Sequence, residues 1–329
     1  MQKKKNDYDE YLANLHSKQI TSEEVIKSVV KEGTGKNVIS KKKIIAGEIN
    51  EVYEINLEDK TQVVLRISRN GPPDFQQEKW AAGQCKKVGV PVPEIILIKY
   101  LRVENQELAF CLMEKIDGEP LERGKIDFDK LPLEQRKNYI NQAGEILSKI
   151  HSISAEGFGG IIGDGKPQFE TSDELILDML SKREEYEKTA REENLDIKLI
   201  PKAMKIIQNF KEVYKKKKPC LNHGDYGHKH FMVKNGKIVG ILDFGSIRSD
   251  TPEYDFSCFD YWFGHYIPIK WLKEGYQNKS LFNAGFEDFL YFIRISKGLE
   301  IFEWYHKQGY KEAMENAKIK LIRDLNYFE

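Results

Sequence analysis

The stretch Cys220–Phe256 reads CLNHGDYGHKHFMVKNGKIVGILDFGSIRSDTPEYDF. Within it, residues 234–237 read KNGK and place an Asn-Gly pair between two apolar runs. This pattern predicts a β-hairpin, because the type I′ turn of a two-residue hairpin needs positive φ at both central positions. The expected pairing sets His230 opposite Ile241, so the hairpin should bring His230 beside Asp243.

Two carboxylates, Asp225 and Asp243, lie on either side of this hairpin in the sequence. Asp225 comes five residues before His230, in the loop that opens the hairpin, and Asp243 lies at the end of its second strand. Such an arrangement can hold a metal ion with one carboxylate and orient a nucleophile with the other.

The strings HGD at 223–225 and ILDFG at 241–245 resemble the catalytic core of the aminoglycoside phosphotransferase-like family of small-molecule kinases. That family shares the protein-kinase fold, in which a catalytic loop supplies a base and the DFG motif supplies a metal ligand. Gly224 stands where protein kinases have Arg and points to the small-molecule branch. His230 stands where Asn is usual, although some antibiotic kinases of this branch are similar in having His there.

The resemblance implies an α+β, bilobal, protein-kinase-like fold. Residues 1–37 would form an N-terminal extension with a short helix. Residues 38–115 would form a small lobe, whose antiparallel sheet and helix bind the nucleotide. Residues 116–329 would form a larger, mainly helical lobe that carries the catalytic and acceptor-binding residues.

The same resemblance implies a role for each matching residue of the C-terminal lobe. Asp225 would accept or orient the proton of the acceptor hydroxyl, and Asp243 would bind Mg2+ with help from His230. His223 and Asp255 would support the catalytic loop. Because imidazole suits transition metals better than Mg2+, we expect Mn2+ to be tolerated at least as well.

The N-terminal lobe contains a clear strand pattern. Apolar and other residues alternate over Gln62–Ser68, so Val64 and Arg66 share the face opposite the main apolar row. Glu78 follows in a segment with helical spacing of its apolar residues. The resemblance implies that Arg66 holds the nucleotide phosphates, that Glu78 pairs with Arg66, and that Val64 faces the base.

Two further segments of this lobe are implied to contact the nucleotide, for which ATP or GTP is expected. Gly47, in the string AGEINEVYEI, would belong to the loop that covers the phosphates. The backbone of Met113, Glu114 and Lys115 would bond the base at the hinge between the lobes. By themselves these residues indicate only a turn with one glycine and a strand that ends in a turn.

Three other segments carry local predictions. Thr21 and Glu24 have the spacing of a capping box at the start of a short helix. Apolar residues at helical spacing predict a long amphipathic helix over residues 133–151. The glycine-rich residues 154–167 are interpreted as a flexible connection.

Composition limits the partners. Lys plus Arg equals Asp plus Glu, 52 each in 329 residues, so the net charge is zero and gives no electrostatic argument for nucleic-acid binding. No stretch approaches the roughly 18 apolar residues of a membrane span, so no membrane association is expected. The four cysteines are far apart and show no metal-binding spacing, which fits reduced thiols and a cytoplasmic protein.

The expected reaction is phosphorylation of a hydroxyl on a small molecule, either an aminoglycoside, another antibiotic or a metabolite. Asp260, Glu300 and Glu303 are candidates to line the acceptor pocket. From residue 251 onward twelve Asp and Glu stand against ten Lys and Arg, too even a balance to require a cationic substrate.

Two alternatives remain at this stage. One is a nucleotide-binding pseudokinase without turnover, which the His at 230 and the single loop glycine would favour. The other is a protein kinase, but PEYDF follows the DFG motif so closely that almost no room is left for an activation loop.

Overall fold

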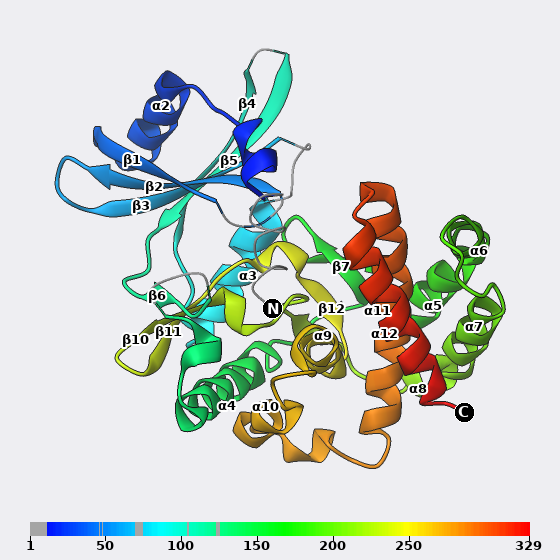
Figure 1. The fold of residues 1–329 in the computed structure, drawn as a ribbon. Coiled ribbons are helices and arrows are strands. Elements are labelled where there is room, and N and C mark those ends of the chain that lie inside the picture. Colours follow the sequence, from blue (N-terminus) through cyan, green and yellow to red (C-terminus); the bar gives the residue numbers. More distant parts are fainter. Residues whose placement is uncertain (1–11, 46, 48, 70–74, 104, 123–125) are drawn as a thin grey trace.

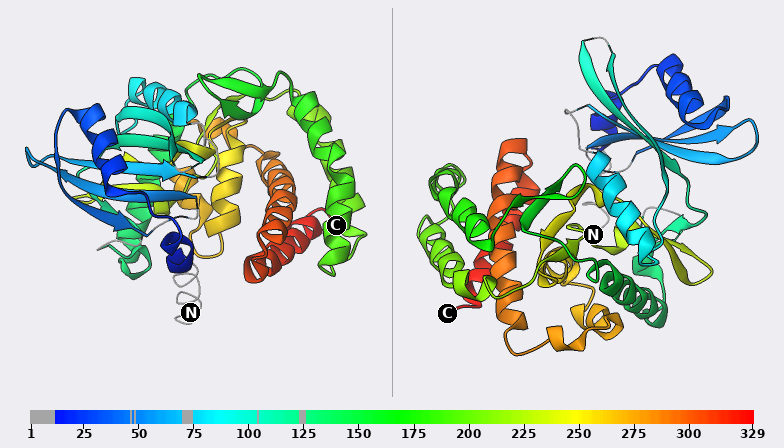
Figure 2. Two further views of the ribbon diagram at one scale, coloured as in Figure 1. Left: turned by 90° about the horizontal axis from the view of Figure 1, so that it is seen from above. Right: turned by 180° about the vertical axis from the view of Figure 1, so that it is seen from behind.

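The computed structural model describes residues 12–45, 47, 49–69, 75–103, 105–122 and 126–329. They form a sheet-rich lobe followed by a mainly helical lobe (Figure 1). The sheet lobe and the group α5–α7, α11 and α12 lie at opposite ends of the molecule, with β12 and α9 between them (Figure 2). The predicted bilobal α+β fold is confirmed.

The N-terminal lobe is built on a five-stranded antiparallel sheet with the spatial order β1-β2-β3-β5-β4. The strands are β1 (Val38–Ile44), β2 (Asn50–Leu57), β3 (Gln62–Ser68), β4 (Ile95–Val103) and β5 (Gln106–Glu114). Helix α2 (Glu23–Thr34) packs in one core with Leu65 and Ile67. Helix α3 (Phe75–Lys87) begins with Phe75, which packs on the opposite face against Ala109 and Cys111. The alternation in β3 therefore separates a core face from a face directed toward α3.

The predicted capping box at Thr21 is wrong. Ser22 is the N-cap of α2, and its hydroxyl accepts the backbone N–H of Val25 at 3.5 Å. Thr21 instead donates its N–H and its hydroxyl to the buried carboxylate of Glu51, at 3.0 and 2.8 Å. A buried carboxylate needs such donors more than a solvent-exposed helix end does, so the tertiary contact outweighs the local motif.

The C-terminal lobe is mainly helical. Its helices are α4 (Leu133–Ile150), α5 (Ser172–Ser181), α6 (Arg183–Glu192), α7 (Leu199–Asn209), α8 (Lys211–Tyr214), α9 (Glu253–Phe263), α10 (Ile269–Gly275), α11 (Phe286–Gln308) and α12 (Lys311–Asn326). The predicted helix over 133–151 is confirmed as α4. Two apolar cores fill the lobe, one around α4, α9 and α10 and the other around α7, α11 and α12.

The interpretation of residues 154–167 as a flexible connection is wrong. They contribute β7 (Phe158–Ile162), which pairs with β8 (Lys166–Phe169) and with β12 (Arg248–Asp250). The four-stranded sheet that results has the order β8-β7-β12-β9, with β9 at Cys220–Asn222. Phe158 and Ile161, which lie between the glycines, are buried in this pairing, so the segment is ordered and its glycines serve turns rather than flexibility.

The Asn-Gly hairpin forms as predicted, but with a shifted register. Strands β10 (Phe231–Lys234) and β11 (Lys237–Ile241) are joined by Asn235 and Gly236, with φ of 51° and 77°. A bulge near Val239 then sets Phe231, not His230, opposite Ile241.

The bulge shifts the strand pairing by one residue, which changes the contacts of His230 at the end of the hairpin. The backbone N–H of Leu242 donates to the carbonyl of His230 at 2.9 Å. His230 still comes next to Asp243, but through this contact and not through the predicted pairing with Ile241. The hairpin also takes up a third strand, β6 (Glu119–Pro120), from the segment that follows the N-terminal lobe.

Within the part of the chain that the structure describes, no helix combines the length and the apolar character that crossing a bilayer requires.

Alanine substitutions at two helix glycines should change the free energy of unfolding in opposite directions. In α4, a Cβ on Gly144 would lie 2.2 Å from the carbonyl oxygen of Leu272 in α10, so Gly144→Ala should destabilise the protein by about 1–3 kcal/mol. In α3, nothing lies within 4 Å of a Cβ on Gly83, so Gly83→Ala should stabilise it by about 0.5–1 kcal/mol. Urea unfolding of both variants measures this, and an unchanged or raised stability of Gly144→Ala would contradict the α4–α10 packing.

Candidate active site

Asp225 lies in the loop between β9 and the short turn His228–His230, where two basic side chains converge on it. The Nε2 of His230 is 3.1 Å from the Oδ2 of Asp225, and the Nζ of Lys229 is 2.8 Å from the same oxygen. Burial raises the pKa of the Asp225 carboxyl, but the hydrogen bond from His230 and the charge of Lys229 hold that pKa well below its ordinary value. Asp225 is therefore an ionised acceptor at neutral pH.

Asp243 lies on the other side of the His230 ring. Its Oδ2 is 3.9 Å from the Nδ1 of His230, and its Oδ1 accepts from the Nη2 of Arg66 at 3.2 Å. Its φ of 67° is in the left-handed region, which a residue other than glycine rarely adopts. A strained backbone of this kind is typical of functional sites, where neighbouring structure enforces it.

The predicted pair of Arg66 and Glu78 is present. The Nη1 of Arg66 on β3 lies 2.5 Å from the Oε2 of Glu78 on α3, and the guanidinium lies over the ring of Phe75. Burial lowers the pKa of Arg66, but Glu78 and Asp243 more than reverse this and raise that pKa above its ordinary value. Arg66 thus presents a permanent positive charge next to Asp243, between the two lobes.

Val64 and Met113 are cross-strand neighbours on β3 and β5, and both pack near Phe75. Their shared side of the sheet is the one that also bears Arg66. This placement is compatible with the expected contact between Val64 and a nucleotide base.

The other residues predicted at the hinge and the phosphate-covering loop make contacts within the protein or lie in a turn. The N–H of Glu114 donates to the carbonyl of Glu94 at 2.9 Å, so that donor is already engaged within the protein. The Nζ of Lys115 lies 3.0 Å from the carboxylate of Glu54. Gly47 lies between β1 and β2 with a φ of 73°, and a Cβ there would have nothing within 4 Å, while its neighbours 46 and 48 lie outside the described residues.

Asp255, on α9, holds the HGD loop at residues 223–225 from the protein interior. It is fully buried, and its two oxygens accept the backbone N–H groups of His223 and Gly224, both at 2.8 Å. The Nε2 of His151 lies 3.2 Å from the same carboxylate. Burial raises the pKa of Asp255, but the hydrogen bond from His151 and the other donors outweigh it and leave that pKa below its ordinary value.

His223 ties the loop to the segment before the DFG motif. Its Nε2 lies 3.0 Å from the carbonyl of Leu242, and its Nδ1 accepts the N–H of Asp225 at 3.3 Å. Burial lowers the pKa of His223, which fits a neutral ring that donates at Nε2 and accepts at Nδ1.

Gly224, between these two residues, has a φ of 81°, and a Cβ there would lie 1.8 Å from the carbonyl oxygen of Ser246. Only glycine fits this close approach between the HGD and DFG segments.

A model of the phosphotransferase enzyme family matches residues 42–280, more than half of the chain. The chain belongs to this family. A comparison with curated proteins found no match.

Solved structures share the fold of this phosphotransferase. A thermostable mutant of the aminoglycoside phosphotransferase APH(4)-Ia, in a ternary complex with ADP and hygromycin B, superposes with a TM-score of 0.75 at 16% identity, covering 92% of this chain and 98% of that chain. The gentamicin complex of APH(2")-IIa has a TM-score of 0.61 at 15% identity, covering 92% and 97%. The GDP and kanamycin complex of APH(2")-IIia has a TM-score of 0.61 at 16% identity, covering 91% and 97%. The protein-kinase-like fold expected from the sequence is therefore confirmed.

For a divalent metal ion, this phosphotransferase offers the carboxylate of Asp243 and the imidazole of His230. Among the described residues, no group of three or more His, Cys, Asp and Glu side chains is arranged to hold a metal. A nucleotide-bound Mg2+ needs only one or two carboxylates from the protein, because phosphates and water supply its other ligands. The residues thus fit an ion brought by the nucleotide, and the imidazole also suits Mn2+.

Lys229 is the residue at this site that the sequence analysis missed. It lies between two histidines directly after the HGD loop, and that position was the available signal. Which way a side chain points from a short turn cannot be derived from such a pattern, so only the structure shows its contact with Asp225.

Of the three acidic candidates for the acceptor side, Glu300 lines a pocket that the described residues form between β12, α9 and α11. Asp260 forms an ion pair with Arg294 on α11, and Glu303 forms one with Lys307 at 2.7 Å. Glu300 lies at the pocket and is exposed. Asp260 and Glu303 do not line this pocket, and charged neighbours on the helices engage both.

Asp255→Asn tests the anchoring of the HGD loop. An amide offers one accepting oxygen where the carboxylate accepts three N–H groups, so at least one buried donor loses its partner. We expect a loss of about 1–3 kcal/mol in the free energy of unfolding. Asp117→Asn, at an exposed carboxylate, is the control and should change it by less than about 0.5 kcal/mol. Similar urea midpoints for the two variants would contradict the anchoring role.

Proposed function

We propose that this phosphotransferase moves the γ-phosphoryl group of ATP or GTP to a hydroxyl group of a small molecule. The observation that carries the proposal is the convergence of Asp225, His230 and Asp243 with the Arg66–Glu78 pair from the other lobe. The fold neighbours support it, since their complexes hold a nucleotide together with hygromycin B or kanamycin. The nucleotide would bind mainly to residues 38–115 and the acceptor to residues 116–329, with residues 1–37 as an extension.

In the proposed reaction the acceptor oxygen attacks the γ-phosphorus as the bond to the bridging oxygen breaks. The hydroxyl proton passes to Asp225, and the nucleoside diphosphate leaves with the bridging oxygen. Lys229 and His230 keep Asp225 ionised before the transfer, and Arg66, braced by Glu78, holds the phosphates. A Mg2+ or Mn2+ ion at Asp243 and His230 would neutralise the charge of the phosphates.

We also propose a cytoplasmic location and no nucleic-acid partner. All four cysteines are free, buried thiols, as expected for a reducing compartment. The net charge of zero offers no extended field for a polyanion.

Asp225→Asn tests the reaction. Loss of the proton acceptor should lower kcat by about 10²–10⁴-fold, with nucleotide affinity nearly unchanged because Asp225 does not hold the phosphates. The measurement is acceptor-dependent release of ADP and GDP with aminoglycosides, macrolides and small alcohols. Asp164→Asn, at an exposed carboxylate between β7 and β8, is the matched control. Equal turnover by wild type and Asp225→Asn would contradict the proposal, and nucleotide binding without turnover by either would favour a pseudokinase.

His230→Asn tests the metal site. The wild-type protein should use Mn2+ at least as well as Mg2+, and the substitution should shift the ratio of kcat/KM for the nucleotide toward Mg2+ by about tenfold. Steady-state kinetics with each metal provide this ratio for both proteins. If the ratio is the same in the two, His230 does not contact the ion.

A further inference from the structure

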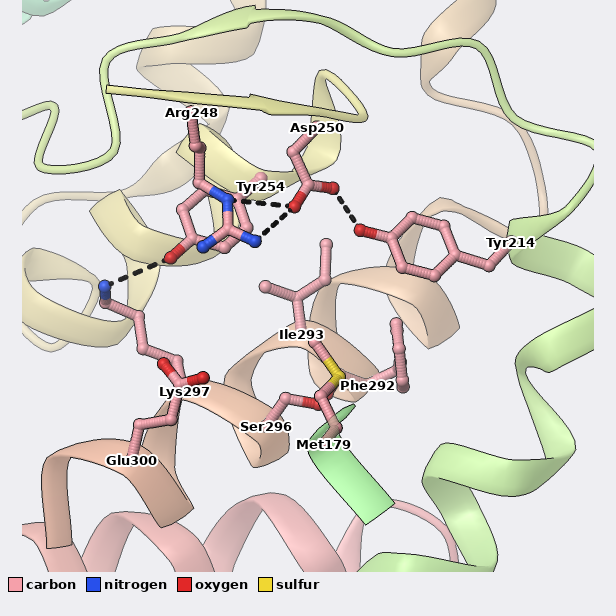
Figure 3. Close-up of a pocket in the computed structure, with 10 residues that line it drawn as sticks. All are labelled: Met179, Tyr214, Arg248, Asp250, Tyr254, Phe292, Ile293, Ser296, Lys297 and Glu300. Atoms are coloured by element: carbon pink, nitrogen blue, oxygen red, sulfur yellow. Dashed lines mark hydrogen bonds and ion pairs between the residues drawn. The ribbon is translucent and has the colours of Figure 1, made fainter. Parts of the chain in front are cut away.

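A pocket lined by both charged and apolar side chains lies in the C-terminal lobe between β12, α9 and α11 (Figure 3). Arg248 and Asp250 enter it from β12, Tyr254 from α9, and Lys297 and Glu300 from α11. Apolar side chains of α5 and α11 close its other side. Nothing in the proposed phosphoryl transfer uses these residues so far.

The pocket adjoins the catalytic loop through the sheet. Strand β12 pairs with β9, and this pairing sets Arg248 opposite Asn222, three residues before Asp225. The same strand follows directly after the DFG segment, whose Ser246 contacts Gly224. Strand β12 therefore connects this pocket directly to the segment that carries Asp225.

Arg248 and Asp250 form an internally neutral pair. The Nε and Nη2 of Arg248 lie 2.9 and 2.7 Å from the Oδ2 of Asp250, and the guanidinium stacks 3.9 Å over the ring of Tyr254. The Oδ1 of Asp250 accepts the hydroxyl of Tyr214 and the backbone N–H of Thr251. Asp250 has thus used both oxygens, whereas the Nη1 of Arg248 has no partner among the described residues.

Lys297 has no such partner for its charge. Its Nζ lies 3.4 Å from the hydroxyl of Tyr254, and within the described part of the chain no carboxylate comes within 4.0 Å of it. Glu300, one turn further along α11, is exposed, and Figure 3 shows no ion pair between it and Lys297. A partly buried ammonium without a carboxylate is costly, so the pocket carries a positive charge that a ligand can neutralise.

We propose that this pocket binds an anionic group of the acceptor, a carboxylate or a phosphate ester, between Lys297 and Arg248. The inference rests on the proposed function and names its substrate class as a small hydroxylated anion. The anion would satisfy the free donors of both side chains, while the acceptor hydroxyl reaches Asp225. A polycation such as an aminoglycoside would meet the charge of Lys297 and find only the exposed Glu300 among the pocket carboxylates, because Asp250 is already saturated.

The test uses acceptors that share a carbon skeleton and differ in the terminal group that sets their charge. One set is glycerol, glycerate, glycerol phosphate and aminopropanediol, and the other is sorbitol, gluconate, sorbitol phosphate and glucamine. Each is titrated by calorimetry into protein saturated with Mg2+ and AMP-PNP, so that phosphate groups cannot enter the nucleotide site, and each is assayed for ADP release with ATP. Anionic members should bind at least about tenfold more tightly than neutral or cationic ones, a difference of about 1.4 kcal/mol. Comparing the carboxylates with the phosphate esters shows which of the two anionic groups the pocket binds.

Lys297→Met removes the charge and keeps the length of the side chain. We expect it to weaken binding of the anionic members by about tenfold or more, to leave neutral members unchanged, and to keep or raise Tm, since an unpaired charge is replaced by an apolar group. Lys297→Arg should retain most of the anion preference. Lys270→Met, at an exposed lysine on α10, is the matched control and should change neither binding nor Tm.

The outcomes separate this inference from the proposed function. Preferential binding of cationic members, an anion preference that Lys297→Met leaves intact, or no binding of any anionic member at about 10 mM would overturn the inference. A lower Tm of Lys297→Met with unchanged anion binding would show a structural role instead. Turnover of a cationic acceptor that Asp225→Asn abolishes would keep the kinase function and reject only the acceptor class.

Discussion

The buried carboxylate of Asp255 is the point on which the geometry of the site depends. It receives the backbone N–H groups of His223 and Gly224 and faces the ring of His151, so one side chain of α9 joins β9 to the end of α4. Hydrogen bonds to an ionised group in such a water-free place are stronger and more directional than surface bonds. Asp225 is the next residue in the chain, so its position is set by this anchor.

Around that anchor, basic and acidic side chains alternate in space. Arg66 meets Asp243 between the lobes, His230 separates Asp243 from Asp225, and Lys229 contacts Asp225. Lys297 and Arg248 line a separate pocket of the C-terminal lobe. Positive groups thus flank the two carboxylates on both sides. These positive groups keep the two carboxylates ionised. The charge of Arg66 suits a nucleotide phosphate, and the charges of Lys297 and Arg248 suit the acidic group of the proposed acceptor.

Local patterns predicted much of the fold correctly where one interaction dominates. The Asn-Gly turn, the alternation in β3 and the helical spacing of α4 each depend on residues close in the chain. The errors arose where a distant contact was decisive. Thr21 bonds Glu51 instead of capping α2, a bulge shifts the pairing of His230, and the glycine-rich segment pairs with β12. No short-range pattern contains the partner in any of these cases.

The sequence by itself determined which residues could do the chemistry, because Asp225, His230 and Asp243 lie close together along one loop and hairpin. Strand and helix periods placed Arg66 and Glu78 on inward faces, and the family resemblance implied that the two residues pair. Only the tertiary structure decided that Lys229 turns onto Asp225, that Asp255 collects three donors, and that Lys297 lacks a carboxylate. These contacts join elements far apart in the chain, and their geometry follows from how the helices pack.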